Sequence, residues 1–117
     1  YSGANNPLWV KFKDRTEITE IKGTKRPVGK YDIQTSFVNH SLELSKGDTV
    51  YLFSDGYADQ FGGEKNKKFK YKTLKKLLLN ISDKNAQEQE DELRQVFETW
   101  KGSLEQVDDV CVAGIKI

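Results

Sequence analysis

The N-terminal half of the chain alternates between apolar and polar residues in the way that strands do. Leu8, Val10 and Phe12 recur with a period of two, which predicts a strand. Residues 16–21 are rich in β-branched side chains and are predicted to pair back on it as a hairpin. Residues 36–44 alternate again and lead through the turn Ser45–Asp48 into the next strand, so those two are predicted to be an antiparallel pair.

Two segments are apolar on both faces. Thr49–Phe53 and Val110–Ile117 lack the alternation of a half-exposed strand, so we predict that both lie inside a sheet covered on both sides.

Two other segments have helical spacing. Leu74, Leu77, Leu78 and Ile81 predict one amphipathic helix, and Leu93, Val96, Phe97 and Trp100 predict a second that ends at Gly102.

Composition narrows the class of protein. The 117 residues suffice for one domain or less, with 36% hydrophobic and 32% charged residues and a mean hydropathy of −0.72. A net charge of +1 argues against nucleic acid or anionic lipid as a partner. The single Cys111 excludes a disulfide framework and suits a reducing, cytoplasmic compartment. The chain has no Met and opens on Tyr-Ser-Gly, so we expect a fragment of something longer.

Acidic residues follow one doubly apolar strand and precede the other. Asp55 and Asp59 come after the first, four residues apart, and a helical turn there would place them on one face. Asp108 and Asp109 come before the second. If the two strands are antiparallel neighbours, these carboxylates converge at one rim of the sheet. Oxygen ligands select Mg²⁺ or Mn²⁺. The alternative for Asp55-Gly56 is an ordinary tight turn.

Basic residues gather in two places. Lys25 and Arg26 lie in a loop between Gly23 and Gly29, where they would meet a phosphate or simply be solvated. A run of lysines then extends from Lys65 to Lys76. It would face a phosphorylated or acidic partner, or nucleic acid in a third reading, but a solvated loop and helix face explains it as well.

Several motifs, in this order, resemble one family. YSGANNP, KGTKRPVG, LSKGDTVYLFSDGYADQFGG, the Trp100-Lys101-Gly102 helix end and LEQVDDVCVAGI together resemble the SpoIIE/RsbU branch of the metal-dependent type 2C-like protein serine/threonine phosphatases. The resemblance runs through residues 1–117 and implies an α+β fold of the α-β-β-α type. In that fold, two antiparallel sheets form a sandwich flanked by helices. This chain would supply the C-terminal part, with five to six strands and two helices.

The resemblance also assigns site residues. It implies that Asp55 and Asp108 bind metal and that Asp59 belongs to a further metal site. It further implies that Gly56, Asp109, Asn5 and Asn6 support these ligands without binding the metal themselves.

The implied activity is hydrolysis of phosphoserine or phosphothreonine on a partner protein by a metal-activated water, without a phosphoenzyme. The complete domain would hold two or more Mg²⁺ or Mn²⁺ ions. In this branch the substrate is often a small anti-anti-sigma-factor domain, and the phosphatase is often the output domain of a bacterial sensor protein. We therefore expect a signalling role in the cytoplasm, or in the cytoplasmic part of a membrane-bound sensor.

One departure from the family limits these expectations. The acidic motifs of the family's first half, an early Gly-Asp and a following Asp-Gly, have no counterpart here. The metal site is therefore expected to be incomplete, with weak or no metal binding, little phosphatase activity and a tendency to self-associate through uncovered sheet edges. The alternative function is a non-catalytic signalling or partner-binding module with the same fold.

Overall fold

The computed structural model describes residues 1–25 and 36–117, which form two compact units. Unit 1 comprises residues 1–52 and 113–117, and unit 2 comprises residues 53–112. The chain passes from unit 1 to unit 2 along one strand and returns along another. No helix in the described part of the chain has the length and apolarity that crossing a membrane requires.

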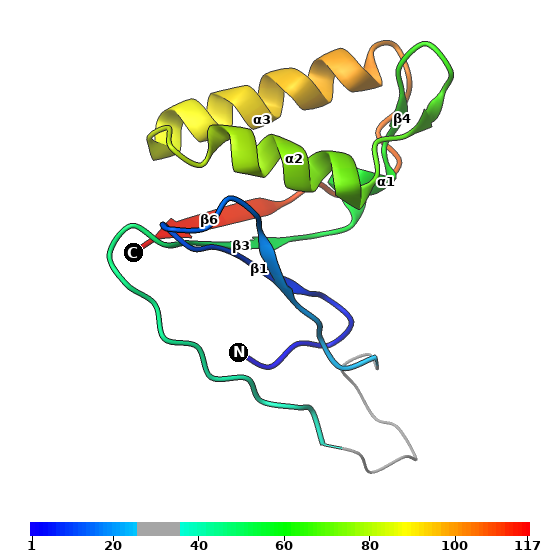
Figure 1. The fold of residues 1–117 in the computed structure, drawn as a ribbon. Helices are drawn as coiled ribbons and strands as arrows, with labels where there is room; N and C mark the ends of the chain where they lie inside the picture. The colour runs from blue at the N-terminus through cyan, green and yellow to red at the C-terminus, as the bar shows by residue number, and fades with distance from the viewer. Residues whose placement is uncertain (26–35) are drawn as a thin grey trace. The chain divides into compact units, whose positions relative to one another are not determined.

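Unit 1 is built on an antiparallel sheet of four strands (Figure 1). The strands are β1 (Leu8–Lys11), β2 (Thr19–Ile21), β3 (Thr49–Phe53) and β6 (Val112–Lys116), in the order β2-β1-β3-β6. β1 pairs antiparallel with both β2 and β3. The predicted hairpin of residues 8–21 is therefore confirmed. The apolar alternation of β1 explains its core, because Leu8 and Val10 are buried together with Val50.

Unit 2 carries the helices and a second, small sheet. Its elements are α1 (Gly56–Asp59), β4 (Phe61–Gly62), β5 (Lys67–Lys68), α2 (Tyr71–Ile81) and α3 (Ala86–Lys101). α2 and α3 are the two predicted helices, and they lie side by side in Figure 1. Together with the four-stranded sheet, these elements confirm the predicted α+β class.

Buried side chains hold unit 2 together. Leu74, Leu78 and Ile81 are buried on one face of α2, as their spacing predicts. Each contributes about 1.5–3 kcal/mol relative to an exposed position. A cluster of rings joins α1, the β4–β5 hairpin and α3. In it the Tyr57 ring packs on those of Phe69 and Phe97 at centroid distances of 5.2 and 5.1 Å.

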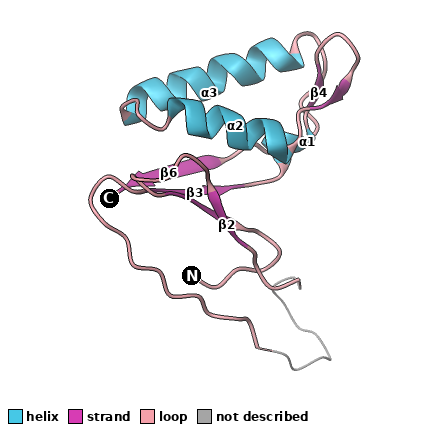
Figure 2. Cartoon of the chain, in the orientation of Figure 1, coloured by secondary structure: helices cyan, strands magenta, loops and turns pink. Residues whose placement is uncertain are grey.

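The predicted strand over residues 36–44 is wrong. These residues form an extended loop (Figure 2) with one isolated bridge, between Asn39 and Ser2. The reason is topological: β3 has two edges, and β1 and β6 occupy them. The loop therefore finds no free edge beside β3, and Val38 on it is 57% exposed.

The prediction that both doubly apolar strands are covered on both faces is also wrong. β6 is the last strand of its sheet, and its residues from Ala113 to Lys116 are exposed. On β3, Thr49, Val50, Tyr51 and Phe53 are buried, but Leu52 is 39% exposed. The described residues thus leave apolar surface uncovered on both strands, and the expected self-association stays a prediction.

The turn before β3 is held by one carboxylate. Asp48 accepts hydrogen bonds from the backbone N–H groups of Ser45 (2.8 Å) and Lys13 (2.7 Å), and these two bonds lower its pKa below the ordinary value. Gly47 has a φ of 100°, a left-handed conformation that glycine adopts without strain. The carboxylate thereby joins this turn to the turn that follows β1.

Asp48 should make the stability of unit 1 depend on acid. Its pKa is lowered by folding, so its contribution is complete above the unfolded value of about 3.9 and is lost as pH falls through the lower folded value. We expect Asp48→Asn to reduce the urea midpoint at pH 7, and the deficit to shrink steadily below pH 4. The control is Asp14→Asn in the neighbouring exposed turn. A deficit that is equally large at pH 7 and pH 2.5 would contradict the assignment.

Candidate functional site

The end of β3 and the start of β6 are joined by Ser54. Its backbone N–H donates to the Cys111 carbonyl at 2.9 Å. Its hydroxyl donates to the Asp109 carbonyl at 2.9 Å and accepts from the Cys111 N–H at 3.0 Å. The two acidic segments therefore meet, as the predicted antiparallel pairing requires, and all of these contacts lie within unit 2.

Gly56 allows the two segments to approach closely. A Cβ atom at this position would lie 2.2 Å from the Asp109 carbonyl oxygen and 3.3 Å from the Asp108 carbonyl oxygen. No side chain fits there without displacing backbone. Gly56, predicted to lie behind the metal ligands, thus brings the residue after Asp55 into contact with the Asp108-Asp109 pair.

Asp55 and Asp59 lie on a single helical turn. The Asp59 N–H donates to the Asp55 carbonyl at 2.9 Å, which is the helical i to i+4 bond that the spacing predicts. The exposed Asp55 side chain makes no capping hydrogen bond to α1. Burial raises the pKa of the Tyr71 hydroxyl, and the charges of Asp59 and Asp55 raise it further. Both carboxylates therefore act on the same hydroxyl at the start of α2.

Asp108 and Asp109 are exposed at the start of the returning segment. An oxygen of the Asp108 carboxylate accepts from the Asp109 N–H at 2.7 Å, and the Asp108 carbonyl accepts from Gln106 Nε2 at 2.9 Å. These local bonds order the segment around Asp108. The Asp109 carbonyl accepts from the Ser54 hydroxyl, and the supporting role of Asp109 behind the metal ligands stays a prediction.

Lys68 on β5 partly balances the acids. Its Nζ lies 3.7 Å from an Asp59 carboxylate oxygen, with the two side chains 50% and 36% exposed. An ion pair this exposed contributes at most about 1 kcal/mol to the stability of the fold. The lysine run from Lys65 to Lys76 is otherwise largely solvated, apart from the half-buried Lys75.

We call the carboxylates of Asp55, Asp59 and Asp108 the acidic rim. The kind of donor at this rim fits Mg²⁺ or Mn²⁺, but the number of donors is small. Asp55, Asp59 and Asp108 offer only carboxylate oxygens, the ligands that hard divalent ions prefer. Within residues 1–25 and 36–117, no three His, Cys, Asp or Glu side chains converge closely enough to hold a metal ion by themselves. An ion at this rim would need waters or further ligands to complete its coordination.

The remaining predicted site residues lie in unit 1 or outside the described residues. Asn5 has a φ of 62°, and its N–H donates to the Thr24 carbonyl at 2.7 Å, while Asn6 accepts from the Tyr1 hydroxyl through its backbone carbonyl. Both asparagines therefore shape a turn, and their role behind the metal ligands stays a prediction. Lys25 is exposed, and Arg26 lies outside the described residues, so phosphate contact also stays a prediction.

Sequence reasoning did not single out Ser54, Gln60, Lys68 or Tyr71. Ser54 and Gln60 immediately flank the Asp55–Asp59 stretch, and that position was the available signal. Gln60 is 0% exposed, whereas a glutamine after a short acidic turn would ordinarily be solvated. Tyr71 and Lys68 reach Asp59 through the tertiary fold, so no spacing along the chain pointed to them.

The chain has the fold of a domain of the type 2C-like (PP2C) phosphatase class. The chain belongs to the family described as Stage II sporulation protein E (SpoIIE), which it matches over residues 1–117. Among solved structures it is similar to the SiaA-PP2C domain of Pseudomonas aeruginosa, with 26% sequence identity and a TM-score of 0.86. That match covers 99% of this chain and 44% of the other chain. No curated protein matches it.

Proposed function

We propose that this chain forms part of a metal-dependent protein serine/threonine phosphatase that removes phosphate from a signalling protein. One observation carries the proposal. The Ser54 hydroxyl donates to the Asp109 carbonyl, and the lack of a side chain at Gly56 leaves room for that carbonyl, so the segments that bear Asp55 and Asp108 lie together. Membership of the SpoIIE family and the likeness to a PP2C domain support the phosphatase class.

In this proposal each acid has its own role. Asp55 and Asp108 would hold Mg²⁺ or Mn²⁺, and Asp59 would contribute to a further site. A bound divalent ion supplies charge stabilisation for the phosphoryl oxygens and lowers the pKa of a bound water. The chain's own residues supply placement. Ser54 fixes the two segments, Lys68 limits the repulsion around Asp59, and the exposure of Asp55 and Asp108 leaves room for a phosphoprotein.

The proposed substrate is a phosphoserine or phosphothreonine protein, such as an anti-anti-sigma-factor domain, with an upstream sensor domain controlling the activity. The free Cys111, which is exposed, supports a reducing cytoplasmic setting. Because the chain spans 44% of the SiaA-PP2C chain, the full set of metal ligands is proposed to need residues beyond those described.

A non-catalytic binding module is the second candidate. The observation that favours it is the lack of a three-ligand cluster among the described residues. The two candidates differ in what the rest of the domain supplies. In a protein that carries this chain within a complete domain, further acids at the same site would favour the phosphatase, and their absence would favour the binding module.

Divalent metal binding by the 117-residue chain tests the ligand assignment. We expect Mn²⁺ to broaden the amide NMR signals of residues 54–59 and 107–111 first, because paramagnetic relaxation falls steeply with distance from the ion. Excess Mg²⁺ should restore the signals, since both ions prefer oxygen ligands. Binding is expected to be weak, in keeping with few ligands, and phosphatase activity on a phosphoserine peptide should be low.

The matched control is Asp91→Asn on α3. Asp91 is exposed and accepts a hydrogen bond from Gln87, which an asparagine oxygen can still accept. This variant should bind Mn²⁺ as the parent does, whereas Asp55→Asn should not. Broadening spread evenly over all exposed acidic residues would contradict a specific site, and rapid peptide hydrolysis by the chain alone would contradict its incompleteness.

A further inference from the structure

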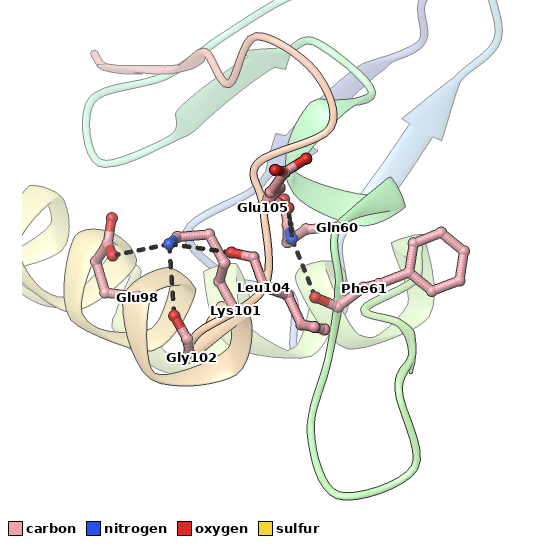
Figure 3. Close-up of polar contacts among 7 residues, drawn as sticks. All are labelled: Gln60, Phe61, Glu98, Lys101, Gly102, Leu104 and Glu105. Carbon is pink, nitrogen blue, oxygen red and sulfur yellow. Dashed lines mark hydrogen bonds and ion pairs between the residues drawn. The ribbon is translucent and has the colours of Figure 1, made fainter.

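Gln60 is a fully buried polar residue at the end of α1. It is 0% exposed, and its Nε2 donates to the Phe61 carbonyl at 3.0 Å and to the Glu105 carbonyl at 2.8 Å (Figure 3). The backbone carbonyl of Gln60 accepts from Trp100 Nε1 at 2.9 Å and from the Phe69 N–H at 3.0 Å. One residue therefore binds the hairpin, the end of α3 and the segment that follows α3.

The amide orientation of Gln60 is fixed by its partners. Phe61 and Glu105 both present carbonyl oxygens, which accept but do not donate, so only the NH₂ group can face them. The opposite atom, Oε1, is buried without a hydrogen-bond partner in the part of the chain that the structure describes. An unpaired buried acceptor is destabilising.

The Glu105 carbonyl begins the segment that carries Asp108. Before it, Lys101 orders the turn at the end of α3, with its Nζ 3.4 Å from the Leu104 carbonyl and 3.8 Å from a Glu98 carboxylate oxygen (Figure 3). After it, Gln106 and Asp108 form local hydrogen bonds within the segment, and the Asp109 carbonyl accepts from the Ser54 hydroxyl. Gln60 and Ser54 therefore hold the two ends of residues 105–109.

These two anchoring residues flank α1 directly. Ser54 precedes Asp55, and Gln60 follows Asp59, so α1 spans the distance between the two anchors. Asp108 is held on a short stretch of chain whose ends are fixed to the ends of the helix that carries the other acids. Loss of either anchor would let Asp108 move relative to Asp55.

We propose that Gln60 is a positioning residue for the acidic rim. By holding the Glu105 carbonyl, it sets where Asp108 lies relative to Asp55 and Asp59, and so sets the divalent-cation affinity of the rim. This inference rests on the proposed function. Residues that orient metal ligands commonly change affinity by about 10–100-fold when they are replaced.

The sharpest test is Gln60→Met in the 117-residue chain. Methionine has a similar length and flexibility, removes both donors and also removes the orphaned Oε1, so the loss of stability should be modest. We expect the Mn²⁺ dissociation constant, measured by signal broadening at residues 54–59, to rise about tenfold. Amide hydrogen exchange at residues 106–109 should accelerate in the same variant, with exchange in α2 unchanged.

The variant Leu78→Ala distinguishes a positioning role of Gln60 from a purely structural one. Leu78 is fully buried on α2, so its truncation destabilises unit 2 without touching residues 105–109. After correction for the folded fraction, the Mn²⁺ dissociation constant of this variant should stay within about twofold of that of the parent chain. The reason is that substitutions at independent sites have additive, uncoupled effects. If it weakens Mn²⁺ binding as much as Gln60→Met does, the positioning role is refuted.

Failure of this inference and failure of the proposed function give different results. If Asp55→Asn abolishes the Mn²⁺ effect and Gln60→Met leaves it unchanged, the ligand assignment stands and the role of Gln60 is refuted. If Asp55→Asn also leaves the Mn²⁺ effect unchanged, the metal site itself is refuted. Should Gln60→Met fail to fold, Gln60→Leu offers a second apolar variant without the amide donors. Unchanged Mn²⁺ affinity in that variant would also overturn the inference.

Discussion

Replacing Gly56 by alanine should both destabilise the chain and abolish specific Mn²⁺ binding. The added Cβ would lie 2.2 Å from the Asp109 carbonyl oxygen and 2.8 Å from its carbonyl carbon, and both are backbone atoms. Gly56 is the first residue of α1 and does not have a positive φ, so alanine suits its backbone conformation. Alanine would gain about 0.5–1 kcal/mol from helix propensity. The clash outweighs this gain, since overpacking against rigid neighbours costs about 1–3 kcal/mol or more.

The free energy of unfolding, measured with urea, should therefore fall by about 2 kcal/mol or more in Gly56→Ala. The Mn²⁺ effect on residues 107–111 should disappear, because the Asp108-Asp109 backbone must move away. The control is Gly114→Ala on β6, where the new Cβ would meet only the Tyr51 side chain, at 3.1 Å. A side chain can yield where a backbone cannot, so that variant should bind Mn²⁺ normally. Equal effects of the two substitutions would show that the close approach at Gly56 is not special.

Replacing Asp55 by asparagine should abolish phosphatase activity in a protein that carries this chain within a complete domain. Asparagine keeps the size and one oxygen but removes the charge that a divalent ion requires. Metal ions contribute several kcal/mol of charge stabilisation in such reactions. At about 1.4 kcal/mol for each factor of ten, we expect kcat/KM to fall by about 10²–10³-fold or more. Asp108→Asn should have a comparable effect, and raised Mn²⁺ should restore part of the activity in both.

In contrast to its activity, the stability of Asp55→Asn should not fall. Asp55 is exposed and does not cap α1, so its charge contributes little to folding, and its removal lowers the repulsion with Asp59. The urea midpoint should be unchanged or slightly higher. Asp91→Asn should keep full activity. Retained activity in Asp55→Asn would refute the ligand assignment, and loss of the fold would show that Asp55 has a structural role instead.

Much of the architecture could be predicted from local pattern. The period of two in residues 8–12 predicted β1, and the helical spacing of Leu74, Leu78 and Ile81 predicted α2. Gly102 ends α3 as expected, with a φ of 56°. These features depend on side chains that are close in sequence, so the sequence carries them directly. The same is true of the helical turn that joins Asp55 to Asp59.

The errors arose where a pattern has no single structural outcome. Residues 36–44 alternate as a strand does, but a strand needs a partner edge, and β1 and β6 already occupy both edges of β3. β6 is apolar on both faces but ends the sheet, so its exposure depends on what covers it and not on its composition. In both cases the competition for edges and cover is decided by distant parts of the chain.

By itself, the sequence indicated the family, strands β1, β2, β3 and β6, helices α2 and α3, and the acidic residues that border β3 and β6. Only the tertiary structure decided how those acids are held. It showed the Ser54 hydroxyl on the Asp109 carbonyl, the contact at Gly56, and the buried Gln60 amide on the Glu105 carbonyl. The physical reason is that backbone carbonyls look alike in every sequence. Which carbonyl a side chain reaches is settled only when segments some 45 to 55 residues apart pack together.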